Sequence, residues 1–569
     1  MSGQSPLATI TRDFAFLIPA DASVVVQVGP GNQELARVYK RINPKCRYVV
    51  ISSEDDAERW EDSGVDQVLV ADWNSTSNLV EFSKGSADCV VFFGAFERLM
   101  APWKVLSEAV EWLKPDGQVL LGVPNVQHWS TLLALVSGKL VYRNQNGFPE
   151  DQLRFFSAET IKDIFDRCGV QLQELRAHGH ESQDWQNIQQ LLQPLLNALQ
   201  IQPQDFAGRS RAQLYFARGI KQDAAPTKTL IQTIMAAPVG CDHIRVYQPN
   251  TFLTTIPAVR TLATQPAKGT GHVQLANPLP DEQRVLIWQR SFLTYPRDIP
   301  TLKNFVQQGY LLVAEMDDDP GRWREYDDMF NFRVCHAVQT STETLADFFR
   351  PHNPNVGVFS NQLAILPPPR PTPGRDEPLT LFFGALNREE DWEPLMPAIN
   401  RVLAKLGDKV RVEVIFDEKF FAALTIPDKQ FTPFCPYEQY LQILGRCHVT
   451  LLPLRETRFN SMKSDLKFLE CAGHSVAVLA SPVVYSNSLR DGETGLLFTN
   501  EREFEDKLQR LLEDSDLRQR LVQTAYEYVR DNRMLSQHFR KRYDWYQQLI
   551  ADLPRLNEEL RQRVPEMFE

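Results

Sequence analysis

Short apolar runs alternate with helical patterns along most of this chain, and this alternation constrains its fold more than any other feature. In the first part of the chain, the runs at residues 23–29, 47–53, 66–72, 87–94 and 117–123 are apolar enough to be buried strands. The segments between them, such as PWKVLSEAVEWLKP, carry apolar residues about 3.6 positions apart, as in helices. Strands that alternate with helices form βαβ units, whose parallel strands are covered on both faces. The pattern therefore predicts a doubly wound α/β sheet.

A second α/β series begins at about residue 230, with strand-like runs at 284–290, 310–320 and in the segment 379–392. The polar stretch KQDAAPTKT precedes it and predicts a linker, and the prolines crowded into 366–378 mark a crossing between two Rossmann-like halves. The sequence thus predicts an N-terminal domain at 1–222, a linker at 223–229, and Rossmann-like domains at 230–370 and 371–534. A helix at 535–569 is predicted to cross back onto the first of these two halves.

Composition excludes several functional classes. With 43% hydrophobic and 23% charged residues, the 569-residue chain has the composition of a folded protein. Its 61 basic and 72 acidic residues give a net charge of -11, so we expect no nucleic-acid partner. The eight cysteines form no CxxC pair, so neither a zinc site nor a disulfide framework is expected. No apolar run approaches the roughly 20 residues that cross a bilayer, and no signal peptide is evident, so we expect a cytoplasmic protein.

Five landmarks in the first domain follow one another in a set order: VQVGPGN, VADWN, FFGAFERL, WLKPDGQVLLGVPNVQHWS and LRFFSAETIKDIFDRCGV. Together with the closing run QLYFARGI, they resemble a class I S-adenosylmethionine-dependent methyltransferase of the sugar-pathway type found fused to glycosyltransferases. The resemblance implies a Rossmann-like fold and S-adenosylmethionine as a cofactor. The positions that match the family's cofactor-binding residues are Gly29, Gly31, Asp72 and Glu97.

Four positions depart from this family. Gln27, Gln33, Ile51 and Arg98 stand where it has an acid, a third glycine, the acid for the ribose hydroxyls and a histidine. Losing the ribose acid removes two charge-assisted hydrogen bonds, each worth about 1.5 to 3 kcal/mol. The domain either still methylates or is a retained scaffold that docks the transferase or its acceptor.

Residues 459–498 combine a polar turn, a short helical stretch with one acid, a small-residue break, an apolar strand and a Gly-rich loop. This order places Lys463, Lys467 and Glu470 at the mouth of an α/β sheet. Because ligands bind at the carboxyl ends of the strands in open α/β folds, and helix starts attract anions, these lysines suit a diphosphate.

The same stretch resembles the donor-binding half of a GT-B glycosyltransferase, a fold of two Rossmann-like domains. The likeness extends over about 239–532 and is to enzymes of bacterial surface-glycan and flagellin-modifying clusters. It implies that Glu470 holds the ribose or sugar hydroxyls of a nucleotide sugar, without a metal. The positions implied for the phosphates are Lys463, Ser464 and Lys467, and Asn460 is a further nucleotide-sugar-binding candidate. Met462 stands where many retaining members have a second glutamate, so the stereochemical course stays open.

The loop after the predicted strand at 379–384 adds three candidates for the donor phosphates. Gly384 lets the backbone approach a phosphate, and Asn387 and Arg388 can bond it. The alternative is that Arg388 pairs with Glu389 or Glu390 on the surface.

Three acids, Asp317, Asp318 and Asp319, end the predicted strand at 310–320 and admit three interpretations. One acid could be the general base for an acceptor hydroxyl, since crowding of like charges raises a carboxyl pKa. The cluster could instead hold a divalent metal, or cap the next helix and position the acceptor. His243 and Arg245, in the loop that opens the transferase, are acceptor-side candidates.

The sequence thus predicts a glycosyltransferase that moves a sugar from a nucleotide-sugar donor to a hydroxyl of an acceptor such as flagellin, a pilin or a lipid-linked glycan. One alternative is a bifunctional enzyme that also O-methylates the sugar. Another is a decayed binding protein that scaffolds a glycan-assembly complex.

Overall fold

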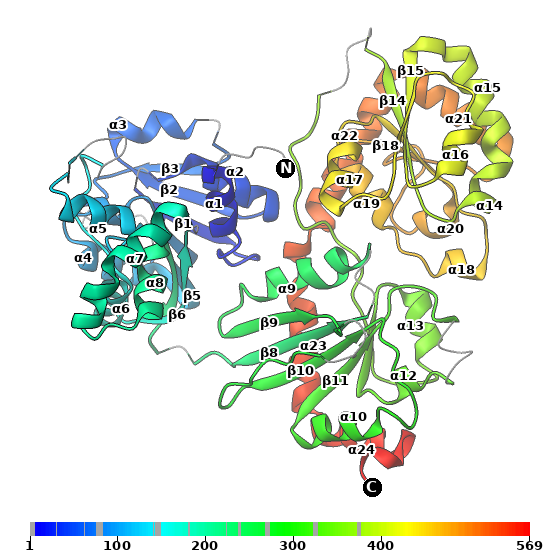
Figure 1. Ribbon diagram of the computed structural model, residues 1–569. Coiled ribbons are helices and arrows are strands. Elements are labelled where there is room, and N and C mark those ends of the chain that lie inside the picture. The colour runs from blue at the N-terminus through cyan, green and yellow to red at the C-terminus, as the bar shows by residue number, and fades with distance from the viewer. Residues whose placement is uncertain are drawn as a thin grey trace. The chain divides into compact units, whose positions relative to one another are not determined.

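Figure 1 shows the computed structural model of the chain, which describes residues 6–29, 31–61, 63–74, 83–139, 141–142, 149–179, 182–223, 225–236, 240–267, 273–321, 328–371 and 377–569. The chain divides into two compact units, Met1–Thr227 with Thr254–Ala258, and Lys228–Leu253 with Val259–Glu569. Three predicted connections lie partly outside the described residues, at 224 in the linker, at 237–239, and at 372–376 in the proline-rich crossing.

A seven-stranded sheet forms the centre of the first unit, in the order β3-β2-β1-β4-β5-β7-β6. Its strands are β1 (Val24–Val28), β2 (Arg47–Ser52), β3 (Gln67–Val70), β4 (Ala87–Phe93), β5 (Leu113–Pro124), β6 (Val170–His178) and β7 (Leu214–Lys221). Neighbouring strands are parallel except β7, which runs antiparallel to β5 and β6. The central strands β1, β2 and β4 are buried over nearly their whole length, which explains their continuous apolar runs.

Helices connect these strands: α1 (Pro6–Ala15), α2 (Gln33–Ile42), α3 (Glu54–Ala57), α4 (Pro102–Trp112), α5 (Trp129–Val136), α6 (Ala158–Arg167), α7 (Gln183–Ala198) and α8 (Pro203–Arg211). Their starts follow local chemistry. Asn32 caps α2 by accepting from the Glu34 N–H at 2.9 Å, and Ser157 and Thr160 form a capping box at α6.

The second unit contains two six-stranded sheets whose strands are all parallel. The first, in the order β13-β12-β11-β10-β8-β9, consists of β8 (Thr229–Met235), β9 (Val259–Thr264), β10 (Gln283–Gln289), β11 (Tyr310–Glu315), β12 (Ala337–Thr340) and β13 (Val356–Val358). Its helices are the π-helical turn η4 (His243–Tyr247), α9 (Gln248–Leu253), α10 (Ile299–Gln307), α12 (Phe330–Arg333) and α13 (Glu343–Phe349).

The other sheet of this unit has the order β16-β15-β14-β17-β18-β19. It consists of β14 (Leu379–Gly384), β15 (Val410–Ile415), β16 (Lys429–Thr432), β17 (Val449–Leu452), β18 (Ala477–Ala480) and β19 (Leu496–Leu497). Its helices are α14 (Glu389–Trp392), α15 (Met396–Leu406), α16 (Glu418–Ala423), α17 (Tyr437–Leu444), α18 (Arg458–Ser461), α19 (Leu466–Gly473), α20 (Pro482–Tyr485), α21 (Glu501–Glu513) and α22 (Ser515–Asn532). The predicted α/β class with parallel sheets is confirmed.

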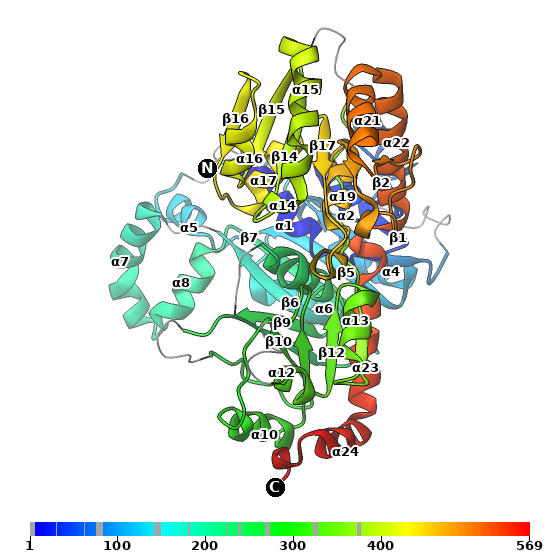
Figure 2. The same ribbon diagram turned by 90° about the vertical axis from the view of Figure 1, so that its right-hand side faces the viewer.

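The C-terminal segment forms two helices, α23 (Phe539–Ala551) and α24 (Leu553–Arg563), where the sequence predicted one. Pro554 has no N–H for a continuous helix and instead fits the first turn of α24. In Figures 1 and 2 both helices lie beside the sheet of β8 to β13. Two contacts fix them there: Tyr546 Oη donates to Gln339 Oε1 at 2.6 Å, and His336 Nε2 lies 3.0 Å from Asn557 Oδ1.

In each sheet the strand order reverses beside the first strand: between β1 and β4, between β8 and β10, and between β14 and β17. The carboxyl ends of the strands part at such a reversal and leave a crevice, the usual ligand site of open α/β sheets. The fold therefore offers three candidate ligand-binding edges, one in each sheet.

Candidate active site

A cavity of about 340 Å³ opens at the carboxyl ends of β14 and β17, where the strand order reverses. Both sheets of the second unit supply its walls. The first contributes Gly240, Cys241, Ile244, Arg290, Asp317, Asp318 and Asn361, and the second contributes Gly384, Ala385, Arg388, Leu452, Lys463, Ser464, Leu466 and Lys467 among others. Seven of the residues predicted from three distant segments line this cavity: Asp317, Asp318, Gly384, Arg388, Lys463, Ser464 and Lys467.

Lys467 lies in the first turn of α19 and reaches the end of β14. Its Nζ donates to the Gly384 carbonyl oxygen at 2.7 Å and lies 5.4 Å from the centre of the Tyr440 ring. Burial lowers the pKa of Lys467, and the nearby Glu470 carboxylate partly offsets this. A lysine held this way has donors to spare for an anion in the cavity.

Glu470, one turn further along α19, is 3% exposed and is held by two tyrosines. Tyr437 Oη donates to one carboxylate oxygen at 2.8 Å, and Tyr440 Oη donates to the other at 3.0 Å. Burial raises the pKa of Glu470, an effect that Lys467 and the two tyrosines oppose. An ionised carboxylate can accept about four hydrogen bonds, so Glu470 retains capacity for the hydroxyls of a ligand.

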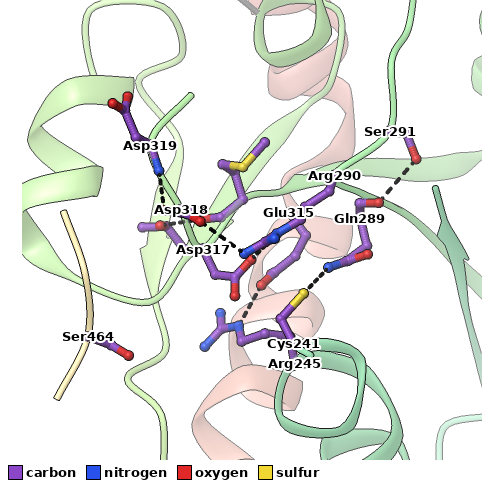
Figure 3. A network of polar contacts seen from close by, with 12 residues as sticks. Cys241, Arg245, Gln289, Arg290, Ser291, Glu315, Asp317, Asp318, Asp319 and Ser464 are labelled. Carbon is purple, nitrogen blue, oxygen red and sulfur yellow. Dashed lines mark hydrogen bonds and ion pairs between the residues drawn. The ribbon is translucent and has the colours of Figure 1, made fainter. Parts of the chain in front are cut away.

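Figure 3 shows Asp317 and Asp318 beside Arg290 at the end of β11, and the two carboxylates differ in their closest partner. Asp317 Oδ1 accepts from Arg290 Nε at 2.7 Å, while the Asp318 carboxylate pairs with Lys463 Nζ from the polar turn before α19. The prediction that crowding raises the carboxyl pKa is wrong for Asp318. Burial alone would raise the pKa of Asp318, but Lys463 and then Arg290 hold it below its ordinary value. Opposite charges lie closer to this carboxylate than the like charges do.

Asp319 has a different role from its two neighbours. Its Oδ1 accepts from the Gly321 N–H at 3.0 Å, so it caps the turn that follows, and it is not among the residues that line the cavity. Asp319 therefore caps the turn that follows it, whereas Asp317 and Asp318 line the cavity. Among the residues that the structure describes, no group of three or more His, Cys, Asp or Glu side chains could hold a metal ion.

Arg388 lines the cavity, and residues outside the cavity wall hold its side chain in place. Its Nη1 donates to Asn460 Oδ1 at 2.6 Å and to Asp391 Oδ2 at 3.3 Å, and its guanidinium lies 5.5 Å from the centre of the Phe459 ring. Asn460 is 3% exposed and positions the arginine without lining the cavity itself. Asn387 also lies outside the lining, at a φ of 53°, a left-handed conformation that asparagine tolerates.

The alternative partners of Arg388 are engaged elsewhere. Lys419 Nζ pairs with Glu389 at 2.8 Å, and Arg455 pairs with Glu390. The guanidinium of Arg388 is therefore directed toward the cavity and away from these two surface carboxylates.

The charges on the cavity wall favour an anion. Among the lining residues, Arg290, Arg388, Lys463 and Lys467 are cations and Asp317 and Asp318 are carboxylates, which leaves two positive charges in excess. The N-terminus of α19 adds its partial positive charge at Leu466 and Lys467. Ser464 Oγ, which accepts from Asn361 Nδ2 at 2.8 Å, completes this rim.

A second cavity of about 400 Å³ shares Gly240, Leu466 and Lys467 with the first. Its walls are mainly aromatic: Phe416, Phe434, Tyr437 and Tyr440, with Glu470 and His243 beside them. The Phe416 and Phe434 rings stack with their centres 5.2 Å apart. Lys467 thus stands between a charged compartment and an aromatic one.

The two acceptor-side candidates, His243 and Arg245, have different surroundings in the structure. His243 lines the aromatic cavity and stacks on Tyr437, with ring centres 5.3 Å apart. Arg245 is 3% exposed and lines neither cavity. Its Nε donates to Glu315 Oε1 at 2.7 Å and its Nη1 to Asn361 Oδ1 at 2.9 Å, so it supports the cavity wall from within (Figure 3).

The matching edge of the first unit lies between β1 and β4 and carries the glycines of the first landmark. Gly29 has a φ of 90°, and a Cβ there would meet the Ala95 Cβ at 2.6 Å and the Trp73 ring at 3.4 Å. A Cβ on Gly31 would meet the Gln27 amide nitrogen at 2.1 Å. Gly29 is therefore required by its positive φ and by the packing of the domain itself, whereas a Cβ on Gly31 would have to displace the end of the buried Gln27 side chain.

The acids at this edge fit S-adenosylmethionine incompletely. Ile51, at the position of the ribose acid, is fully buried, and Glu54 is exposed. Asp72 is exposed and accepts from the Asn74 N–H at 3.0 Å, as in a local turn. Glu97 is 5% exposed, its Oε2 has no hydrogen-bond partner among the described residues, and burial raises its pKa to about 7. These residues do not supply the contacts that the resemblance implies.

Sequence reasoning missed three residues of the candidate site. Arg290 follows the end of β10, so the rule that ligands meet the carboxyl ends of strands could have identified it. Tyr437 and Tyr440 precede Glu470 by 33 and 30 positions, and no local pattern indicates that they hold its carboxylate.

Two family profiles match the chain. A profile described as a methyltransferase domain matches residues 5–175, and one described as glycosyl transferase-like matches residues 401–543. The chain therefore carries a segment similar to methyltransferase domains and, after it, a segment similar to glycosyl transferases. The two matches stand in the order that the sequence resemblance implies, so that resemblance is confirmed.

No curated protein matches the chain. Among solved structures, TarM is similar at 15% identity with a TM-score of 0.35, over 47% of this chain and 55% of TarM. The match thus spans about half the length of TarM. A glycosyltransferase from Rickettsia africae is similar at 11% identity with a TM-score of 0.43, over 57% of this chain and 99% of that one. A methyltransferase from Thermotoga maritima is similar at 16% identity with a TM-score of 0.25, over 37% of this chain and 92% of that one.

No helix in the described ranges is both long and apolar enough to cross a membrane.

Proposed function

We propose that this protein transfers a sugar from a nucleoside diphosphate donor to a hydroxyl group of a glycan or protein acceptor. The observation that carries the proposal is the cavity at the end of β14 and β17, where excess positive charge and a helix N-terminus face the same space. The acceptors implied by the sequence resemblance are a surface glycan, flagellin, a pilin or a lipid-linked glycan.

The donor diphosphate belongs at Lys467 and the start of α19. When the bond between the sugar and the diphosphate breaks, negative charge develops on the leaving phosphate oxygen, and fixed donors stabilise it without reorganisation. Lys463 and Lys467, from the turn before α19 and its first turn, and Arg388, from the segment after β14, supply these donors. No metal is needed to balance two phosphate charges against the two cations in excess.

The nucleoside belongs in the aromatic cavity that adjoins Lys467. A base is flat and apolar on its faces, so it can stack on Phe416, Phe434 or Tyr437. Glu470 lines that cavity together with Lys467, so its carboxylate is available to the ribose hydroxyls of a bound nucleoside. The two tyrosines that hold Glu470 fix its orientation before the donor arrives.

Donor binding also changes the state of Asp318. In the structure Lys463 neutralises this carboxylate, which lowers its pKa and makes it a weak base. A diphosphate that takes over Lys463 weakens this pair, so the pKa of Asp318 rises toward the range useful to a general base. The acceptor hydroxyl proton would then go to Asp318 only after the donor is bound.

Titration of the full chain with UDP, GDP and dTDP tests the proposal. We expect one of the three to bind saturably, and Lys467→Met to weaken that binding about 10- to 100-fold, because a charge-assisted contact to phosphate is worth about 1.5 to 3 kcal/mol. Isothermal calorimetry measures both affinities on the intact protein.

Lys419→Met is the matched control, since it makes the same substitution in the same domain at a surface lysine paired with Glu389. Its affinity should equal that of the unaltered protein. If no nucleotide binds, or if both variants bind alike, the cavity is not a donor site.

A further inference from the structure

A separate cavity of about 210 Å³ lies in the second unit at the start of α23. Its wall includes Phe359, Ser360 and Gln362 from the segment after β13, and His538, Lys541 and Arg542 from the start of α23. None of the described residues that line it is an acid.

The first turn of α23 has its charges reversed with respect to the helix dipole. A helix N-terminus is partially positive and favours acids, yet Arg540, Lys541 and Arg542 occupy this turn and no acid does. The N-cap residue, His538, makes no capping hydrogen bond with its side chain. Lys541 and Arg542, the two of these cations that line the cavity, are unfavourable at this N-terminus unless an anion occupies the space in front of them.

Arg542 provides an independent sign of a ligand. The residue is 8% exposed, and its guanidinium lies 5.1 Å from the centre of the Phe359 ring. Only its Nη1 has a hydrogen-bond partner among the described residues, the Arg245 carbonyl oxygen at 3.2 Å. The nearest buried carboxylate, Glu315, is already paired with the Arg245 side chain. A nine-tenths buried guanidinium that faces a cavity without a carboxylate lacks its counter-ion.

Lys541 adds a second free cation to the same wall. Its side chain is exposed and forms no ion pair with any residue in the described part of the chain. Arg540, between the two, does not line the cavity. The cavity thus combines one buried guanidinium, one exposed ammonium and a helix N-terminus.

We propose that this cavity binds a phosphate group, either as the free ion or carried on a sugar. A phosphate accepts hydrogen bonds on several oxygens, so it can meet the planar fork of Arg542, Lys541 and the first N–H groups of α23 together. The size of the cavity suits a phosphate with a small substituent and excludes a whole nucleotide.

The position of the site connects it to the donor cavity. Phe359, Ser360 and Gln362 line the phosphate cavity, whereas Asn361 between them lines the donor cavity. Arg245 holds this segment from the inside, through the Phe359 carbonyl oxygen at 2.5 Å and Asn361 Oδ1 at 2.9 Å. A phosphate at Arg542 would therefore order the same segment that forms one wall of the donor cavity.

Calorimetric titration of the full chain with inorganic phosphate in a chloride buffer tests the proposal. The titration is made in a Lys467→Met background, so that the donor cavity contributes little. We expect saturable binding that Lys541→Glu weakens by about tenfold or more, and Arg542→Met likewise, because each loses a charge-assisted contact. Glucose 6-phosphate in a parallel series separates the two sources: equal affinity supports the free ion, and tighter binding supports a phosphate carried on a sugar.

Arg540→Glu is the matched control, since it makes the same charge change in the same helical turn outside the cavity wall. The affinity of this variant for phosphate should stay within about threefold of that of the Lys467→Met background, because only long-range charge effects remain. Thermal unfolding in chloride shows whether each variant folds. If Arg542→Met does not fold, Lys541→Glu still tests the proposal, because Lys541 is exposed and its substitution should not disturb folding. No binding up to about 10 mM phosphate, or an equal loss in Arg540→Glu, would overturn the proposal. Nucleotide binding is measured separately, so either proposal can fail alone.

Discussion

Two strand-order reversals in this chain are built alike and differ in charge. Between β14 and β17, Gly384 ends the first strand and faces a cavity lined with more cations than carboxylates. Between β1 and β4, Gly29 follows the first strand and faces Ala95 and the Trp73 ring. The carboxylates near that second edge are an acid engaged in its own turn, Asp72, and a buried one, Glu97.

The glycines do not explain this difference. A Cβ on Gly384 would meet the Phe382 ring at 2.7 Å, much as one on Gly29 would meet Ala95. Each glycine is needed for close packing, whatever ligand lies beyond it. What separates the two edges is the set of charged side chains that remain directed at open space. A glycine-rich turn therefore indicates the fold, and the neighbouring charges indicate the ligand.

The largest effect is expected at Asp318, the acid on the charged edge. Asp318→Asn should lower kcat by about 10² to 10⁴, the range for removing a general base, while KM for the donor stays constant or falls because Lys463 is released. Steady-state kinetics with the donor identified by titration separates the two constants.

Asp319→Asn is the companion variant, because asparagine can still accept from the Gly321 N–H and the residue lies off the cavity wall. Its kcat should remain within about threefold of the original value, as for a preserved cap. An equal loss of kcat in Asp318→Asn and Asp319→Asn would show that these acids act only by maintaining the structure of their loop.

A smaller contrast is expected between the two edges in cofactor binding. No carboxylate stands at position 51 to hold the ribose, because Ile51 occupies it, so two charge-assisted hydrogen bonds are missing. The affinity for S-adenosylhomocysteine should therefore be about a hundredfold or more below that of a site that has this carboxylate. Titration of the intact chain should show no saturation below about 1 mM, while a nucleoside diphosphate saturates far lower. Micromolar binding of S-adenosylhomocysteine would mean that the first edge is a working cofactor site.

The sequence predicted the fold well where strands are buried on both faces. β1, β2, β4 and β14 each lie within a predicted segment, and β10 begins one residue before its predicted segment. Strands that the sequence did not resolve, such as β13, β16 and β19, have two to four residues and half-exposed patterns. Such strands are set by pairing with a neighbour, which a local pattern does not contain.

The candidate site was predictable in part for a similar reason. Lys463, Lys467 and Glu470 lie on one turn and one helix, so their spacing placed them together, and the structure brings them to adjoining cavities. The pairing of Lys463 with Asp318 joins residues 145 positions apart, and it reverses the pKa effect expected from three adjacent acids. Only the packed structure determines which charge is nearest.

The smallest expected effect concerns Glu97, at the edge of the first unit. Burial raises its pKa to about 7 from an ordinary 4.5. The folded unit therefore binds this proton more tightly than the unfolded chain does. The resulting stability is fully present below about pH 4.5 and is lost as the pH rises through about 7, by about 3 kcal/mol in all.

Glu97→Gln should remove this loss, because the amide stays neutral and retains the shape of the side chain. We expect unfolding of the first unit to cost about 3 kcal/mol more in the variant at pH 8, and nearly the same as in the original protein at pH 5. Chemical denaturation at the two pH values measures it, with Glu108→Gln, on the exposed side of α4, as the control. If Glu97→Gln instead destabilises the unit at pH 8, the carboxylate is ionised there and has a partner, as a ligand-binding acid would.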